Sequence, residues 1–113
     1  MKIAILGASG IGKFHARTFD KLNVEVNSIL CSSKVTGKST SQDLQDSLGL
    51  KVNYYDDLDM LLNKSMPDAI TICTPNELHY EQILKVLPNI RVKAIINNKF
   101  IIVMVLLVLS IFE

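Results

Sequence analysis

An apolar run followed by a glycine-rich turn opens the chain, and no other feature limits its fold as strongly. Residues 3–6 read Ile-Ala-Ile-Leu, which is typical of a parallel strand buried on both faces. Gly7, Gly10 and Gly12 follow, and an amphipathic helical pattern begins at Ile11. A strand, a glycine-rich turn and a helix in this order present free backbone N–H groups and the positive end of a helix dipole to a phosphate. The opening stretch therefore predicts a nucleotide-binding fold.

The glycine spacing fits two dinucleotide-binding patterns. In the frame Gly-x-Gly-x-x-Gly, Gly7 and Gly12 are the first and third glycines, and Ser9 stands at the second. Gly10 beside Ser9 can supply the room that a second glycine would give the pyrophosphate. The same residues also fit Gly-x-x-Gly-x-Gly, a spacing found in short-chain dehydrogenases. Either frame predicts a pyrophosphate site, and the alternative is a tight strand-to-helix turn that binds no ligand.

Further apolar segments read as strands and alternate with helical patterns. They cover residues 24–31, 51–55, 69–73 and 92–96. Strands that alternate with helices through short turns are typical of a parallel sheet with helices on both faces. A chain of 113 residues is long enough for one such domain. We therefore predict a single α/β domain with a Rossmann-like, doubly wound parallel sheet over residues 1–99.

The first and last helical patterns are expected to pack large apolar side chains on the sheet. The first begins at Ile11, and the last covers residues 77–87. Between them, Asp56 or Asp57 is expected to cap a helix that runs through Leu62, because acidic residues are favourable in a first helical turn. The predicted inner faces are Ile11, Phe14, Phe19 and Leu22 in the first helix, and Leu78, Ile83, Leu84 and Leu87 in the last.

A polar segment separates the second and third strands. We expect a loop over residues 32–41, then a short helix that Ser39 and Gln42 open as a capping box and that Gly49 closes. Within the loop, the letters Gly-Lys-Ser at 37–39 imitate the end of a phosphate-binding P-loop. The full motif needs a glycine five positions earlier, where this chain has a serine. The imitation therefore predicts no phosphate site.

Charge and cysteine content exclude several classes of function. The net charge is +1, and the chain has no basic cluster, aromatic ladder or zinc-ligand spacing, so we expect neither a nucleic-acid partner nor a metal. Cys31 and Cys73 end apolar runs, which favours reduced, packed thiols. The first apolar run is too short for a signal peptide. These features predict a cytoplasmic protein.

The last part of the chain is its compositional anomaly. Residues 100–112 are apolar except for Ser110. As a helix this stretch would span about 20 Å, which is short of the roughly 30 Å core of a bilayer, so no membrane association is expected. Its uncharged, β-branched composition instead favours aggregation unless it is covered. We predict that residues 100–113 form an apolar tail and contain no second domain.

Polar residues follow the second predicted strand, at the place where the adenosine ribose of a dinucleotide is expected. NAD-preferring sites usually have Asp or Glu here to accept a hydrogen bond from the 2′-hydroxyl. This chain instead offers Ser32, Ser33 and Lys34. Hydroxyls and an ammonium suit a 2′-phosphate, so NADP is slightly favoured over NAD. The alternative is an ordinary polar loop after a strand.

Two longer motifs resemble the N-terminal domain of the Gfo/Idh/MocA oxidoreductases. They are Gly-x-x-x-Ile-Gly-Lys-Phe-His-Ala-Arg, which begins at Gly7, and Asp-Ala-Ile-Thr-Ile-Cys-Thr-Pro-Asn-Glu-Leu-His-Tyr-Glu at 68–81. The run Tyr-Asp-Asp-Leu at 55–58 is also similar, and the resemblance extends over about residues 2–87. It implies an NAD(P)-dependent enzyme of sugars, inositols or related compounds. It outweighs the short-chain dehydrogenase reading, which would also require a Tyr-x-x-x-Lys pair absent here.

The resemblance also implies which residues surround the cofactor. The pyrophosphate would lie against Gly7, Ser9, Gly10, Ile11 and Gly12. Thr74, Pro75 and Asn76 would lie beside the nicotinamide half, and His79 would open the following helix near the cofactor. Alternatively, Pro75 only fixes a turn, and His79 and His15 are packed histidines; for His15 we favour that interpretation.

The family carries Glu-Lys-Pro after its fifth strand, and that lysine hydrogen-bonds the reacting hydroxyl or carbonyl of the substrate. Without gaps, Lys99 matches this lysine, while Asn98 replaces the glutamate and Phe100 replaces the proline. Lys99 is thus the candidate catalytic residue. The alternative is a surface lysine at the end of a strand.

The chain contains no counterpart of the second α/β domain that supplies most of the substrate pocket in the family. We therefore expect a cofactor-binding half, truncated or frameshifted before that domain and inactive alone. Two other interpretations remain open: a non-catalytic NAD(P)-binding or dimerising module, and a small reductase that completes its site as a homo-oligomer. A small-molecule substrate is expected only if another domain or subunit completes the site.

Overall fold

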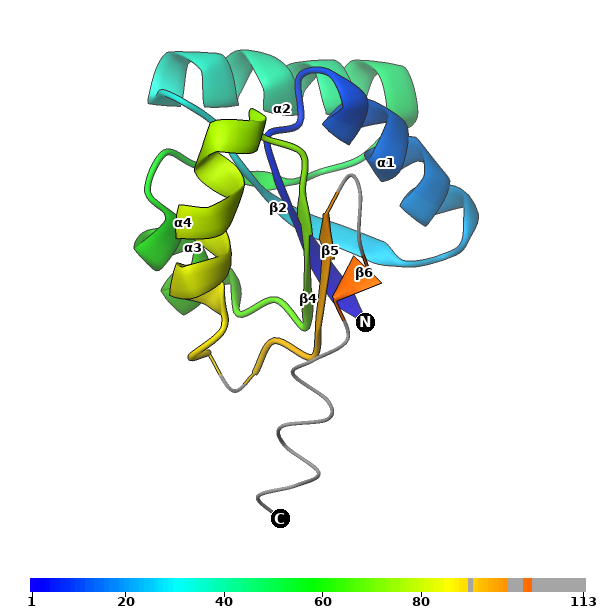
Figure 1. Cartoon of the computed structure of the whole chain (residues 1–113). Coiled ribbons are helices and arrows are strands. Elements are labelled where there is room, and N and C mark those ends of the chain that lie inside the picture. The colour runs from blue at the N-terminus through cyan, green and yellow to red at the C-terminus, as the bar shows by residue number, and fades with distance from the viewer. Residues whose placement is uncertain (90, 98–100, 103–113) are drawn as a thin grey trace.

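A computed structural model describes residues 1–89, 91–97 and 101–102 of the chain. Within them, the sheet has six strands in the order β3-β2-β1-β4-β5-β6 (Figure 1). The elements are β1 (Lys2–Leu6), α1 (Ile11–Lys21), β2 (Glu25–Leu30), α2 (Lys34–Leu48), β3 (Asn53–Tyr55), α3 (Leu58–Ser65), β4 (Ala69–Ile72), α4 (Asn76–Val86), β5 (Ala94–Asn97) and β6 (Ile101–Ile102). Strands β1 to β5 are parallel, which confirms the predicted doubly wound α/β fold.

Strand β6 is an addition to the five strands that the sequence predicts. It pairs antiparallel with β5, through Ile95 with Ile102 and Ile96 with Ile101. The predictions for Lys99 and for the rest of the apolar tail, residues 100 and 103–113, fall outside the described residues.

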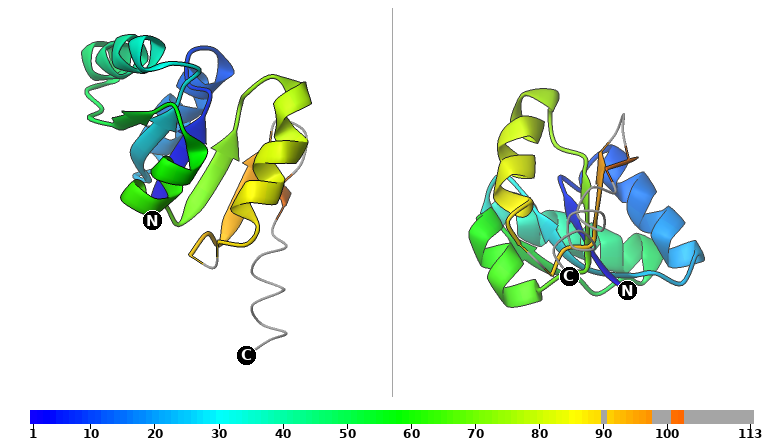
Figure 2. Two further views of the ribbon diagram at one scale, coloured as in Figure 1. Left: turned by 90° about the vertical axis from the view of Figure 1, so that its left-hand side faces the viewer. Right: turned by 60° about the horizontal axis from the view of Figure 1, so that its bottom comes forward.

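The sheet separates two hydrophobic cores, because side chains of a strand point alternately to its two faces. Helices α3 and α4 cover one face, where Ala4 and Leu6 of β1 are buried. Helices α1 and α2 cover the other face, where Ile3 and Ile5 are buried (Figure 2). Strand β1 is thus covered on both faces, as its continuous apolar run predicts.

The predicted inner face of α1 was largely wrong, because only Phe19 of its four residues packs against the core. Ile11, Phe14 and Leu22 are 50%, 66% and 66% exposed, and the buried residues of the helix are Gly12 and Ala16. A Cβ on Gly12 would overlap the carbonyl oxygen of Gly7. The helix therefore lies so close to the strand and turn that only small residues fit between them.

The predicted inner face of α4 was also largely wrong. Ile83 packs against the core, but Leu78, Leu84 and Leu87 are exposed. The buried residues of this helix are His79 and Val86. Positions 79, 83 and 86 lie on one face of the helix. The buried face therefore includes a histidine, which a search for apolar side chains alone does not find.

Helix α2 begins at Lys34, where the sequence analysis expected a loop over residues 32–41. Ser33 is its N-cap and accepts a hydrogen bond from the backbone N–H of Thr36. Gly49 ends the helix in the left-handed conformation, with φ of 70°, as predicted. Gly37 lies inside the helix, so the P-loop imitation is not a phosphate-binding turn, which confirms that prediction.

Candidate functional site

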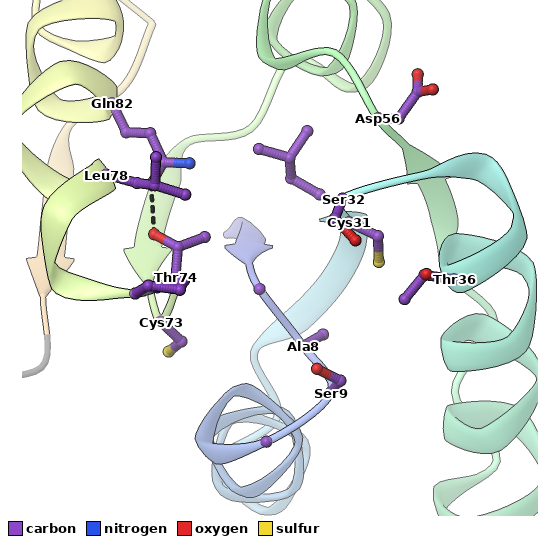
Figure 3. A pocket seen from close by; sticks show the side chains of 14 residues that line it. Ala8, Ser9, Cys31, Ser32, Thr36, Asp56, Cys73, Thr74, Leu78 and Gln82 are labelled. Carbon is purple, nitrogen blue, oxygen red and sulfur yellow. Dashed lines mark hydrogen bonds between the residues drawn. The ribbon is translucent and has the colours of Figure 1, made fainter.

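A cleft of about 420 Å³ opens at the carboxyl ends of the strands, where β1 lies between β2 and β4 (Figure 3). The glycine turn after β1 forms its base. One wall comes from the residues that follow β2 and β3, and the other from those that follow β4 together with α4. The volume is within the range of ordinary small-molecule sites. The sheet reverses its strand order here, which is where open α/β sheets bind ligands.

The turn after β1 brings backbone atoms, not side chains, to the base of the cleft. Gly7 has a φ of +85°, and a Cβ on it would lie 3.0 Å from the carbonyl oxygen of Cys73 and from the backbone nitrogen of Thr74. Gly7, Ser9 and Gly10 line the cleft. Any larger residue at position 7 would be strained and would collide with the neighbouring loop.

Helix α1 begins at this turn without a side-chain cap. Gly10 is its N-cap residue, and no side chain accepts a hydrogen bond there, nor does the first turn contain an acidic residue. The first N–H groups therefore remain available to an anion. Gly12 does not line the cleft, because it packs the helix against the turn. Ile11 is also outside the lining, and its side chain is half exposed.

On the β2 side, the three predicted residues have different environments. Ser32 lines the cleft, whereas Ser33 is occupied as the cap of α2. Lys34 is exposed at the first position of that helix and is not part of the cleft lining. Thr36, which the sequence analysis missed, lines the cleft, and its hydroxyl oxygen lies 3.0 Å from that of Ser33.

Asp56 also lines the cleft and was missed as a site residue. It follows β3, whose Tyr55 pairs with Leu30 of β2, and the backbone N–H of Cys31 donates to the carbonyl of Tyr55 over 2.8 Å. A carboxylate therefore stands beside the end of β2, although no acidic residue follows that strand in sequence. Asp56 could have been predicted as a site residue from the pairing of β2 with β3, which places the ends of the two strands side by side.

On the β4 side, Thr74 is held by two hydrogen bonds from the following helix. Its carbonyl oxygen accepts from Nε2 of His79 over 2.6 Å. Its hydroxyl donates to Oε1 of Gln82 over 2.6 Å, the bond drawn in Figure 3. Thr74 and Pro75 line the cleft, while Asn76 begins α4 outside the lining. His79 is 8% exposed, so its observed role is to fix the Thr74 loop.

Gln82 and Leu78 belong to the same wall, and Leu30 also lines the cleft. The sequence analysis did not name these three residues as site residues. Leu78 was assigned to the helix core, although its exposure of 39% reflects a place at the cleft. The spacing of Leu78 and Gln82, four positions apart on one helix, is the signal that could have placed them together.

Both cysteines are free and line the cleft. Burial raises the pKa of the Cys31 thiol, against a smaller lowering by its hydrogen bond with Thr40. Burial likewise raises the pKa of Cys73, against its hydrogen bond with Thr71. These thiols are therefore protonated at neutral pH and are poor nucleophiles.

His15 packs beside Cys73 on the α1 face of the sheet. Its Nδ1 lies 3.2 Å from the hydroxyl oxygen of Thr71 and 3.6 Å from Sγ of Cys73. This partly buried polar contact agrees with a packed histidine. Across the described part of the chain, no group of three or more His, Cys, Asp and Glu side chains could hold a metal ion. Helices long and apolar enough to cross a membrane are also absent from those residues.

Comparison with known proteins assigns the chain to a family of oxidoreductases. Residues 1–99 match a family described as "Oxidoreductase family, NAD-binding Rossmann fold". The D-glucoside 3-dehydrogenase of Escherichia coli (strain K12) is 31% identical over 88 residues, which cover 77% of this chain and 24% of that protein.

Solved structures with the same fold include two inositol dehydrogenases. The myo-inositol 2-dehydrogenase from Lactobacillus plantarum superimposes with a TM-score of 0.70 at 18% identity, over 86% of this chain and 27% of that one. The scyllo-inositol dehydrogenase from Lactobacillus casei with bound cofactor NAD(H) and scyllo-inositol gives 0.66 at 22% identity, over 86% and 27%. The chain thus spans about a quarter of the length of these relatives.

Proposed function

This chain belongs to the Gfo/Idh/MocA oxidoreductase family through its NAD-binding Rossmann fold, and from that premise we propose that the cleft holds a nicotinamide dinucleotide. The uncapped N-terminus of α1 behind the Gly7 turn carries the proposal. A pyrophosphate there would accept hydrogen bonds from the free N–H groups and face the positive end of the helix dipole. The residues present fit this group, because Gly7 and Gly10 leave the backbone bare. When bound, the nicotinamide would supply hydride chemistry.

A substitution at Gly10 can test dinucleotide binding without disturbing the fold. A Cβ on Gly10 would meet no atom within 4 Å, and an acidic residue at this cap position is favourable for the helix. We expect Gly10→Asp to keep the stability of the protein and to weaken NADH binding about tenfold or more, because its carboxylate takes the place of the pyrophosphate. Fluorescence titration with NADH measures the affinity, and thermal unfolding measures the stability.

Gly10→Ala is the matched control, since it adds the Cβ without the charge. It should bind NADH more tightly than Gly10→Asp does. Unchanged NADH affinity in Gly10→Asp, or no dinucleotide binding by the wild-type chain, would contradict the proposal.

We also propose that NADP is slightly preferred over NAD. Ser32 lines the cleft and Lys34 is two residues away at the start of α2, so a hydroxyl and an ammonium stand near the expected 2′-phosphate. The Ser33 hydroxyl contributes less than the sequence suggests, because it caps the helix.

The activity of a whole enzyme is a separate proposal, since the chain spans about a quarter of its relatives' length. We infer that, in a complete enzyme, a hydride would pass between the nicotinamide and a carbinol carbon of a sugar or polyol, with Lys99 as the group that hydrogen-bonds the reacting oxygen. Support for this comes from the family match and from the sequence around Lys99. We place the protein in the cytoplasm, with no nucleic-acid or membrane partner and with homo-oligomerisation open to test.

A further inference from the structure

The outer end of the cleft continues into a second cavity of about 250 Å³. The two cavities share Leu30 and Asp56 on one side and Leu78 and Gln82 on the other. The cleft therefore extends beyond the glycine turn and the Thr74 loop, into the space between the residues after β3 and helix α4. Its outer end is lined by three leucines, by the carboxylates of Asp56, Asp57 and Glu81, by the Gln82 amide and by Lys85. Among these polar residues, Asp56 and Gln82 are the two that also line the first cavity.

Gln82 is fixed with its amide nitrogen toward this space. Its Oε1 accepts the Thr74 hydroxyl, so the rest of the amide, Nε2, remains as a donor. In Figure 3 that nitrogen points from α4 into the cleft, while Asp56 stands at the opposite rim. Gln82 Nε2 is not a buried unpaired atom, since it is open to the cleft, where a ligand atom can accept a hydrogen bond from it.

The inference rests on the proposed function, which sets the direction of the ligand. With the pyrophosphate at the glycine turn and the adenosine ribose near Ser32, the base extends to the outer end of the cleft, between Leu30 and Leu78. The edge of adenine farthest from its ribose carries the N1 acceptor and the 6-amino donor. That edge reaches the part of the cleft where Gln82 and Asp56 stand.

We propose that Gln82 and Asp56 read the Watson–Crick edge of the adenine base. The Gln82 amide donates to N1, and the Asp56 carboxylate accepts from the 6-amino group. Asp56 is exposed, so its carboxylate can rotate toward the base. Hypoxanthine presents a donor at N1 and an acceptor at position 6, so both contacts would become mismatched. The pair thus makes this site selective for adenine over hypoxanthine.

Reduced nicotinamide hypoxanthine dinucleotide is the probe that tests this pair, compared with NADH by fluorescence titration of the full chain. We expect NADH to bind about tenfold more tightly to the wild-type protein. Gln82→Glu should narrow the difference, because a carboxylate still accepts from Thr74 and also accepts from the N1–H of hypoxanthine. Gln45→Glu introduces the same charge at an exposed position of α2, outside the cleft, and should leave the difference unchanged.

Asp56→Asn is a second variant at an exposed position, where folding is not at risk. It should narrow the difference as well, with Asp20→Asn as its control, since Asp20 is also exposed and lies outside both cavities. Equal wild-type affinities for the two dinucleotides, or a difference that neither cleft variant changes, would overturn the inference and leave the proposed function standing. Failure of both dinucleotides to bind would overturn the proposed function itself.

Discussion

Lys34 is the residue on which the proposed preference for NADP depends. It is exposed at the first position of α2, two residues after the cleft-lining Ser32. We expect Lys34→Ala to weaken NADPH binding about tenfold and to leave NADH binding nearly unchanged, because one charge-assisted contact to the 2′-phosphate is lost. Lys38→Ala, one helical turn further on, is the matched control. Calorimetric titration with both dinucleotides checks the prediction, and equal affinities of the wild-type protein for NADPH and NADH would contradict it.

The two thiols predict how stability depends on pH. Burial raises the pKa of Cys31 and of Cys73 above the 9.0 of an exposed cysteine. In the unfolded chain the thiols lose their protons as the pH rises through about 9, while the folded chain still holds them. The unfolded state then binds fewer protons, so the free energy of unfolding falls as the pH rises further. Below that range this contribution to stability is fully present.

Urea unfolding between about pH 7 and pH 10 measures this effect. We expect the wild-type free energy of unfolding to fall more steeply over this interval than that of the double variant Cys31→Ala/Cys73→Ala. All other titratable groups are the same in both proteins, so their contributions cancel in the comparison. Parallel curves for the two proteins would show that the thiols do not carry the effect.

At the residue scale, the sequence alone predicts those site residues that lie together in one segment of the chain. The glycine turn is predictable because Gly7, Ser9 and Gly10 follow one another in the chain, and all three line the cleft. Asp56 and Gln82 were missed because strand register and helix docking bring them to the same cleft from other segments. Periodicity within one segment carries no information on such contacts between elements.

At the element scale, α2 shows how a tertiary contact overrides local preference. Glycine costs about 1 kcal/mol relative to alanine inside a helix, and Gly37 lies in the polar segment 32–41 that was expected to be a loop. In the structure a Cβ on Gly37 would lie 2.8 Å from Cδ2 of Tyr54. The glycine lets the helix approach β3, so the cost in helix propensity is offset by packing.

A double-mutant cycle tests this explanation of Gly37. We expect Gly37→Ala alone to destabilise the protein by about 1 kcal/mol, because the new methyl group meets the Tyr54 ring. In a Tyr54→Ala background the same change should stabilise it by about 1 kcal/mol, since only the gain in helix propensity remains. Urea unfolding of the four proteins gives the coupling. The same effect of Gly37→Ala in both backgrounds would contradict the explanation.

Helices α1 and α4 differ from prediction for a related reason. Large apolar side chains at helical spacing predict that a buried face exists, but they do not say how close the helix lies to the sheet. At α1 the contact between Gly12 and the Gly7 turn leaves room only for small residues. At α4 the inward face carries His79, whose hydrogen bond to Thr74 satisfies it in the core.

At the scale of the whole molecule, the sequence predicts the architecture more reliably than the helix faces. Five apolar segments alternate with helices, and the handedness and shortness of such connections leave few arrangements of the strands. The position of the cleft follows from the same rules, because ligands bind where the strand order reverses. Strand β6 was missed, since its pairing with β5 reverses direction and an apolar run alone does not indicate direction.

The same scale also determines whether the chain can catalyse a reaction. Dinucleotide binding needs the glycine turn, the N-terminus of α1 and the Thr74 wall, all of which belong to the described cleft. Turnover needs in addition a substrate held about 3–3.5 Å from the nicotinamide, a placement worth roughly 7–11 kcal/mol. It also needs a positioned acid or base, worth about 10²–10⁴-fold in rate. Lys99 is the candidate for that role, and the residues after it in this sequence are almost entirely apolar.

We therefore expect the 113-residue chain to bind NADH or NADPH and to turn over no sugar, inositol or keto derivative. An apolar segment offers no side-chain hydrogen bonds to hydroxyl groups, so a polyol would not be held beside the cofactor. Dinucleotide titration, followed by a substrate screen at the absorbance of the reduced nicotinamide, checks both halves of the prediction. The screen should be run at several protein concentrations, because an enzyme completed by self-association would gain specific activity as the concentration rises. Steady turnover that Lys99→Ala abolishes would contradict the prediction and identify the chain as a functional reductase.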